Sequence, residues 1–213
     1  MGKIKDSNLY LVLSEDCGRL RPAAELARLA ISGGIDILQM REKDKTRQEL
    51  LKLGLELSGI CRENNVTFIV NDDPAIAKET GADGVHLGQE DLAKWGLEKT
   101  RGLLGHDSVI GVSTHSLEQF KKANGEDFDY IAFGPVFPTK TKDYFIGTGD
   151  AAEILKIAEK PVVFIGGIDL DNLDELLCLG ARNIAVIRAI LGQADVAGAA
   201  ANFREKIGRY TRI

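Results

Sequence analysis

The sequence has few cysteines, no long apolar run and no secretion signal. Its three cysteines, Cys17, Cys61 and Cys178, lie far apart and form no CxxC pair. A disulfide framework and a zinc site are therefore not expected. No apolar run reaches the roughly 20 residues that a membrane-spanning helix needs, and the apolar stretch near the N-terminus is too short for a signal peptide. These absences predict a cytoplasmic protein without a membrane partner.

The sequence also lacks an excess of positive charge. It has 27 Lys and Arg residues against 32 Asp and Glu residues, which gives a net charge of -5. Nucleic acid is therefore not an expected partner, and any cationic site must be local. The five prolines are spread thinly and no low-complexity linker interrupts the chain. We expect a single domain that spans residues 1–213.

Short apolar runs alternate with amphipathic, helix-like stretches along the whole chain. Apolar residues recur at helical spacing in stretches such as "PAAELARLAISGG" and "DAAEILKIAEK". The strand candidates are residues 9–13, 36–42, 67–72, 84–88, 109–115, 130–136, 161–167 and 183–190. Nearly continuous apolar strands are typical of a parallel sheet that is covered on both faces. Eight strand–helix units predict an α/β fold, a closed (β/α)8 TIM barrel.

In such a barrel the functional residues follow the carboxyl ends of the strands. After the second strand candidate, Gln39, Arg41 and Lys43 alternate with Met40 and Glu42, so the first three share one face. An Arg and a Lys at a barrel mouth can bind phosphate groups. The alternative is a solvated loop with an Arg–Glu pair.

Acidic residues follow the third and fourth strand candidates. Asp72 and Asp91 could share Mg²⁺, which takes one or two carboxylates together with water and substrate phosphate oxygens. Asp73 precedes "PAIAKETG" and is interpreted as a helix N-cap. Asp91 could equally be the N-cap of a helix that starts at Leu92.

Hydroxyl and basic residues gather after the later strand candidates. The stretch "GPVFPTKTKDYF" (residues 134–145) follows the sixth run, and Gly166–Gly167 follows the seventh, where barrels commonly bind phosphate. Ser116 is interpreted as an N-cap and His115 as a structural residue. No nucleophilic triad is evident. Two anion-binding regions and a metal pair fit chemistry with a diphosphate leaving group.

Taken in order, the motifs "QMREK", "VNDD", "GADGVHLGQED", "IGVSTHS", "GPVFPTKTK" and "FIGGI" resemble the thiamine-phosphate synthase family. The resemblance covers nearly the whole chain. It implies a transferase that joins hydroxymethylpyrimidine diphosphate to thiazole phosphate, giving thiamine phosphate and diphosphate. It further implies Mg²⁺, early loss of diphosphate, capture of a pyrimidine-methyl cation by the thiazole nitrogen, and a homo-oligomer, namely a dimer.

The resemblance also implies roles for individual residues. Asp72 and Asp91 match the magnesium ligands of the family. The matches to the thiazole phosphate contacts are Thr139, Thr141, Gly167, Ile187 and Arg188. The matches to the pyrimidine diphosphate contacts are Gln39, Arg41, Lys43, Asn71, Ser113 and Lys142, of which Arg41, Lys43, Ser113 and Lys142 are the expected catalytic residues.

Two features leave alternatives open. Arg188 stands where the family often has a small hydroxyl residue, so it could strengthen a phosphate contact or point away. A thiazole tautomerase shares the barrel and an "REK"-like stretch, but it tends to lack the second acidic ligand and "GPVFPT". A non-catalytic regulator that binds thiamine or phosphate on the same barrel is the other alternative.

Overall fold

The computed structural model describes residues 4, 8–139 and 144–211. Eight parallel strands close into a barrel in chain order, and β8 pairs with β1 through Leu9 and Ile184. The strands are β1 Leu9–Leu13, β2 Ile37–Met40, β3 Thr67–Asn71, β4 Gly84–Leu87, β5 Val109–Thr114, β6 Tyr130–Phe133, β7 Val162–Ile165 and β8 Asn183–Val186. The predicted (β/α)8 fold is confirmed.

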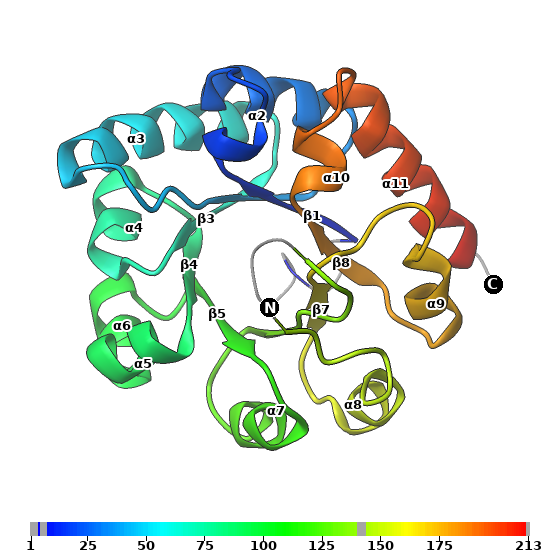
Figure 1. Cartoon of the computed structure of the whole chain (residues 1–213). Coiled ribbons are helices and arrows are strands. Elements are labelled where there is room, and N and C mark those ends of the chain that lie inside the picture. Colours follow the sequence, from blue (N-terminus) through cyan, green and yellow to red (C-terminus); the bar gives the residue numbers. More distant parts are fainter. Residues whose placement is uncertain (1–3, 5–7, 140–143, 212–213) are drawn as a thin grey trace.

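Helices form a ring outside the barrel (Figure 1). They are α2 Ala23–Ser32, α3 Arg47–Glu63, α4 Pro74–Thr80, α5 Gln89–Trp95, α6 Leu97–Leu104, α7 Leu117–Asn124, α8 Ala151–Ile157, α9 Leu173–Cys178, α10 Arg188–Leu191 and α11 Val196–Thr211, with a short 3-10 helix η1 at Glu15–Cys17. No helix of the described ranges is long and apolar enough to cross a membrane.

Seven of the eight strands end one to four residues before the expected boundary, and two of the wrong boundaries bear on the site. The strand expected at residues 183–190 ends at Val186, and Arg188 begins α10. The helix expected from Leu92 begins earlier, at Gln89, with Gly88 as its N-cap. Asp91 is therefore in the first turn of α5 and does not cap that helix.

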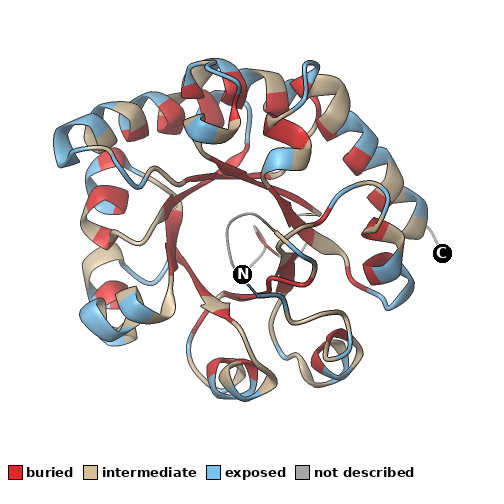
Figure 2. Cartoon of the chain, in the orientation of Figure 1, coloured by how far each residue is buried: buried red, intermediate tan, exposed pale blue. Residues whose placement is uncertain are grey.

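Apolar side chains form two cores, one on each side of the barrel wall. Side chains such as Tyr10, Val12 and Tyr130 fill the interior, whereas Leu11 and Phe133 belong to the larger core between strands and helices. Successive strand residues point to opposite faces, so each strand contributes to both cores. The strands are accordingly buried along most of their length (Figure 2).

Carboxylates accept hydrogen bonds from backbone amides at the amino-terminal end of the barrel. Asp36, Asp83 and Asp129 stand just before β2, β4 and β6, and each accepts a hydrogen bond from a backbone N–H of the preceding strand. The donors are Leu9 at 3.0 Å, Phe68 at 2.9 Å and Ile110 at 2.8 Å. These bonds satisfy amides at the start of strands that lack a partner within the sheet. This end of the barrel is therefore stabilised by structural acids.

Candidate active site

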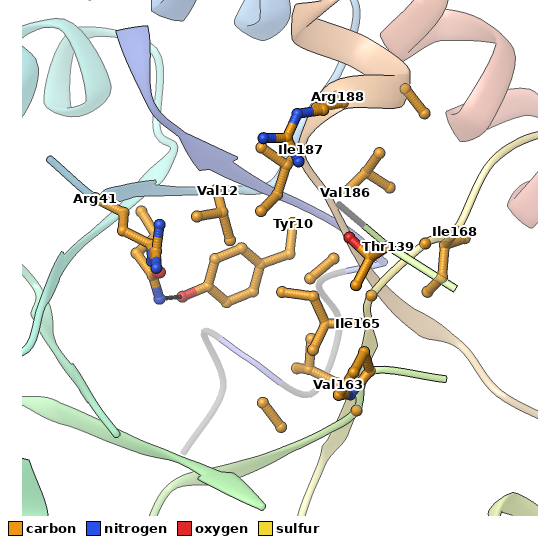
Figure 3. A pocket seen from close by; sticks show the side chains of 18 of the residues that line it. Tyr10, Val12, Arg41, Thr139, Val163, Ile165, Ile168, Val186, Ile187 and Arg188 are labelled. Atoms are coloured by element: carbon orange, nitrogen blue, oxygen red, sulfur yellow. Dashed lines mark hydrogen bonds between the residues drawn. The ribbon is translucent and has the colours of Figure 1, made fainter. Parts of the chain in front are cut away.

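Among the described residues, a large cavity opens at the carboxyl ends of the strands. Its volume is about 1370 Å³, which is enough for two small molecules side by side. Apolar side chains line its centre, and among them Val12, Val163, Ile165 and Val186 come from three different strands (Figure 3). Polar and charged side chains surround this centre.

The end of β2 supplies one polar side of the cavity. Gln39, Arg41 and Lys43 all line it, as their period-two spacing predicted. Met40 instead belongs to the outer core. The Glu42 carboxylate accepts a hydrogen bond from the backbone N–H of Glu15 at 2.7 Å, and burial raises the pKa of Glu42. Glu42 therefore fastens the loop after β1, which leaves Arg41 and Lys43 as the cationic groups of this side.

Two carboxylates meet where β3 and β4 end. A Cβ atom added to Gly88 would lie 3.0 Å from Asp91 Oδ2 and 3.8 Å from Asp72 Oδ1, so both side chains approach the same glycine. Asp72 has a left-handed backbone with φ of 68°, and its N–H donates to the His86 carbonyl at 2.8 Å. Burial, and then the neighbouring Asp91, raise the pKa of Asp72 to about 6.

This carboxylate pair fits the donor set of a magnesium site. The described residues contain no group of three or more His, Cys, Asp and Glu side chains that could hold a metal. Mg²⁺ does not need such a group, because it commonly binds one or two carboxylates and keeps several waters. Asp73 takes no part, because its carboxylate accepts from Ala75 N–H at 2.8 Å and Ile76 N–H at 3.0 Å. That is the helix cap predicted for it.

The ends of β3 and β5 supply Asn71 and Ser113, which both line the cavity. Ser113 Oγ lies 2.8 Å from His86 Nε2. Ser116 caps α7 by accepting from Gln119 N–H at 3.1 Å. His115 Nδ1 lies 2.5 Å from the Gly134 carbonyl oxygen, which agrees with the structural role predicted for it.

The loop after β6 is held against the end of β7. Val136 N–H donates to the Ile165 carbonyl at 3.0 Å, and Phe137 N–H donates to the Gly166 carbonyl at 2.9 Å. A Cβ atom on Gly167 would lie 2.4 Å from the Pro138 oxygen, so only glycine allows this approach. Thr139 and Gly167 thereby line the same cavity. The predicted residues Thr141 and Lys142 lie outside the described residues.

The segment after β8 completes the cavity. Ile187 and Arg188 both line it. In Figure 3 Arg41 and Thr139 lie on opposite sides of Tyr10, and Arg188 lies above Tyr10 between them. The cavity therefore has two polar sides with an apolar centre between them.

Three inward-facing polar residues were missed by the sequence reasoning. Tyr10, His86 and Tyr130 are buried and line the cavity, but no role in the site was predicted for them from the sequence. The available signal was the period of two, which places Tyr10 with Val12 and Tyr130 with Ala132 on the inner face. Burial lowers the pKa of His86 to about 4, with smaller effects of His115 and Arg41.

A closed (β/α)8 barrel with cationic and hydroxyl groups around its mouth is typical of barrel enzymes that act on phosphorylated small molecules. A family model described as thiamine monophosphate synthase matches residues 9–190. The chain therefore belongs to the thiamine monophosphate synthase family, a family of transferases, as its motifs predicted.

Individual relatives are similar to this chain along almost its full length. A thiamine-phosphate synthase of Persephonella marina is 41% identical over 193 residues, which cover 90% of this chain and 91% of that protein. One of Methanocella arvoryzae is 39% identical over 206 residues, or 95% and 96% of the two chains. The solved thiamine phosphate pyrophosphorylase of Pyrococcus furiosus superposes with a TM-score of 0.87 at 35% identity, covering 98% of this chain and 97% of that one.

Proposed function

We propose that this chain condenses 4-amino-2-methyl-5-hydroxymethylpyrimidine diphosphate with 4-methyl-5-(2-hydroxyethyl)thiazole phosphate, giving thiamine phosphate and diphosphate. The observation that carries the proposal is the single cavity with two polar sides and an apolar centre. Two phosphorylated rings can occupy such a cavity with their reacting atoms in the middle. The proposed enzyme acts in the cytoplasm as a homodimer.

The pyrimidine diphosphate would occupy the side formed by β2, β3 and β5. Arg41 can bind phosphate oxygens with two parallel hydrogen bonds, and Lys43 adds a compact positive charge. Gln39 lies deeper, 4% exposed, where a ring rather than a phosphate would reach it. The residues assigned to this substrate are Gln39, Arg41, Lys43, Asn71, Ser113 and Lys142.

Asp72 and Asp91 are the residues that would hold Mg²⁺. Their approach to Gly88 places two carboxylates at the same mouth as Arg41 and Lys43. A bound Mg²⁺ would supply positive charge that stabilises diphosphate as a leaving group. The carboxylates themselves would fix the position of that charge beside the cationic side chains.

The thiazole phosphate would occupy the side formed by the loops after β6, β7 and β8. The tight contact of Gly167 with Pro138 brings backbone groups and the Thr139 hydroxyl to one place. Arg188, at the start of α10 after β8, lines the cavity and would add a charge where the family often has a hydroxyl. The residues assigned here are Thr139, Thr141, Gly167, Ile187 and Arg188.

The reaction needs little covalent help from the protein. The bond between the pyrimidine methylene carbon and the diphosphate oxygen breaks first, and the electron pair leaves with diphosphate. The thiazole nitrogen then donates its lone pair to the methylene carbon. Arg41, Lys43 and Ser113 would stabilise the departing charge, and the apolar centre would exclude water from the cation. Alignment of the two rings supplies the rest.

The proposal predicts that the purified protein forms thiamine phosphate and diphosphate from both substrates with Mg²⁺. Asp91→Ala should lower kcat by at least roughly 100-fold, because losing even an outer-shell partner of a metal costs up to that much. Steady-state kinetics and calorimetric titration of Mg²⁺ in the presence of inorganic diphosphate are the measurements.

Asp107→Ala, at an exposed loop position, is the matched control and should behave as the unmodified protein. An Asp91 variant with an unchanged requirement for Mg²⁺ would remove Asp91 from the metal site. Tight binding of both substrates without product would indicate a regulator rather than a synthase.

A further inference from the structure

Three charged side chains join the loops that follow β1 and β2. The Glu42 carboxylate accepts a hydrogen bond from the backbone N–H of Glu15 at 2.7 Å, and the Glu15 carboxylate accepts from Lys45 Nζ at 2.6 Å. The other carboxylate oxygen of Glu15 accepts from Ala23 N–H at 2.8 Å, where α2 begins. Glu15, Glu42 and Lys45, which we call the Glu15 cluster, are not among the residues assigned to either substrate.

The Glu15 cluster continues the connection between the first two strands beyond the end of the sheet. β1 ends at Leu13 and β2 ends at Met40, and Arg41 N–H still donates to the Leu13 carbonyl at 2.9 Å. The next residue, Glu42, bonds to the backbone of Glu15 through its carboxylate. The backbone on both sides of the Arg41 Cα atom is therefore held against the loop after β1.

The same cluster holds the short segment that carries Lys43. Glu42 and Lys45 both bond to Glu15, the first to its backbone N–H and the second to its carboxylate. The segment between them is therefore fixed at its two ends. Lys43 itself is exposed, whereas Glu15, Glu42 and Lys45 are half-buried. The protein core does little to hold Lys43, so its position depends on these two ends.

The bonds of the cluster lie on the side of this segment that faces away from the cavity. Arg41 and Lys43 line the cavity, whereas the side chain of Glu42, which stands between them in the chain, reaches the loop after β1. Fixing Glu42 therefore fixes the direction in which both neighbours enter the cavity. A diphosphate group offers several anionic oxygens, and two cations held at a fixed spacing can bind it together. Charge that is positioned in advance needs no rearrangement when the diphosphate leaves.

We propose that Glu15 and Glu42 are positioning residues for a diphosphate group. Through the Glu15 cluster they hold the segment that carries Arg41 and Lys43, so that both cations bind one diphosphate. Neither carboxylate touches the substrate. That the diphosphate group belongs to the pyrimidine substrate rests on the proposed function, whereas the positioning of two cations for a diphosphate group does not.

The direct test is the affinity of the full chain for inorganic diphosphate with Mg²⁺, measured by calorimetry. By charge alone, removing a carboxylate beside two cations would strengthen the binding of an anion or leave it unchanged. Loss of the bond to Glu15 acts in the opposite direction, because a displacement of about 1 Å costs up to roughly 100-fold. Glu42→Ala should therefore raise the Kd of inorganic diphosphate by roughly tenfold or more. An unchanged or lower Kd, or no binding by the unmodified chain, would overturn the proposal.

Two conservative variants separate the lost hydrogen bond from a general loss of structure. Glu42→Gln keeps an amide oxygen that can accept from Glu15 N–H, so the Kd should stay within about twofold of the unmodified value. Glu15→Gln keeps one acceptor oxygen instead of two, so it loses a bond to Lys45 or Ala23. It should raise the Kd roughly threefold or more, and it replaces Glu42→Ala if that variant does not fold. If Glu42→Gln binds diphosphate as weakly as Glu42→Ala, the bond to Glu15 is not the cause and the proposal is wrong.

Steady-state kinetics then show whether the effect is confined to one substrate. Glu42→Ala should raise the KM of the pyrimidine diphosphate by roughly tenfold or more. The KM of the thiazole phosphate should change by less than about twofold, because the loops after β6, β7 and β8 do not belong to the Glu15 cluster. Glu205→Ala removes an exposed ion pair with Arg209 on α11, and as the matched control it should change neither value.

The outcomes distinguish this proposal from the proposed function. Equal rises of both KM values in Glu42→Ala would indicate that the whole site is loosened, which contradicts a positioning role for diphosphate. If the unmodified chain forms no thiamine phosphate but the Kd of inorganic diphosphate rises as expected in Glu42→Ala, the proposed function is wrong and the positioning role stands. If the product forms and Glu42→Ala leaves that Kd unchanged, only the positioning role is wrong.

Discussion

At the scale of single residues, the position of Tyr130 depends on a glycine in the neighbouring strand. Gly111 of β5 stands opposite Tyr130 of β6. A Cβ atom on Gly111 would lie 2.0 Å from Tyr130 Cζ and 2.5 Å from Tyr130 Oη. Tyr130 is fully buried, and its ring occupies the space that a side chain at position 111 would need. The missing side chain is therefore what admits a tyrosine into the barrel interior.

We predict that Gly111→Ala lowers the free energy of unfolding by about 1–3 kcal/mol, the usual cost of overpacking a core. Urea denaturation followed by circular dichroism measures this change. Gly59→Ala in α3 is the control, because its Cβ would meet nothing within 4 Å. It should be neutral or stabilise by up to about 1 kcal/mol. Equal effects of the two substitutions would refute the steric argument.

At the scale of elements, one buried arginine joins α6 to the start of β5 and β6. Arg101 donates to the Ser108 carbonyl at 2.5 Å and the Asp127 carbonyl at 2.8 Å. It also donates to the Asp129 carboxylate at 2.8 Å, and that carboxylate accepts from Ile110 N–H. The guanidinium thus holds two loops and two strands together at the amino-terminal end of the barrel.

Arg101→Ala should therefore destabilise the fold by about 3 kcal/mol, because it leaves a partly buried carboxylate and two carbonyls without their partner. Arg47→Ala removes the exposed Arg47–Glu79 pair and should cost less than about 1 kcal/mol. Thermal and urea denaturation of both variants measure the difference. If Arg101→Ala costs no more than Arg47→Ala, the bridging role is wrong.

Much of the element order was predictable, but some boundaries were not. The first strand was expected at residues 9–13, where β1 lies, because its continuous apolar run ends at polar residues. The eighth strand was expected to continue to residue 190, but the residues "RAIL" form the helix α10. A short apolar run fits both the period of two of a strand and the period of 3.6 of a helix. Only the change of backbone conformation at Ile187 separates the strand from the helix.

At the scale of the whole molecule, two of the three cysteines can report whether α3 separates from the barrel. Cys61 is on the buried face of α3, and Cys178 is exposed at the end of α9. Burial, with a smaller effect of Asp83, raises the pKa of the Cys61 thiol to about 12. Thiolate is the reactive form. Cys61 is therefore protected from modification both because it is buried and because its thiol stays protonated.

We predict that iodoacetamide at pH 8 modifies Cys178 in the native protein, whereas Cys61 reacts only after unfolding. Mass spectrometry of peptides over time measures each site, and a sample in guanidinium chloride should show both modified. Rapid native modification of Cys61 would mean that α3 leaves the barrel without global unfolding.

The residues alone determine the barrel and the composition of its mouth. Parallel strands that alternate with helices place every strand end at one rim, so Arg41, Lys43, Asp72, Asp91 and Thr139 could be assigned to one site from their positions in the chain. Chain order cannot say which of these side chains touch. Only the pairing of β3 with β4 brings Asp72 to Gly88 and Asp91, and only the closed barrel joins Gln39 to Ser113 through Tyr10, Tyr130 and His86. Periodicity reports the face of a side chain, whereas contact across a barrel depends on strand register and curvature.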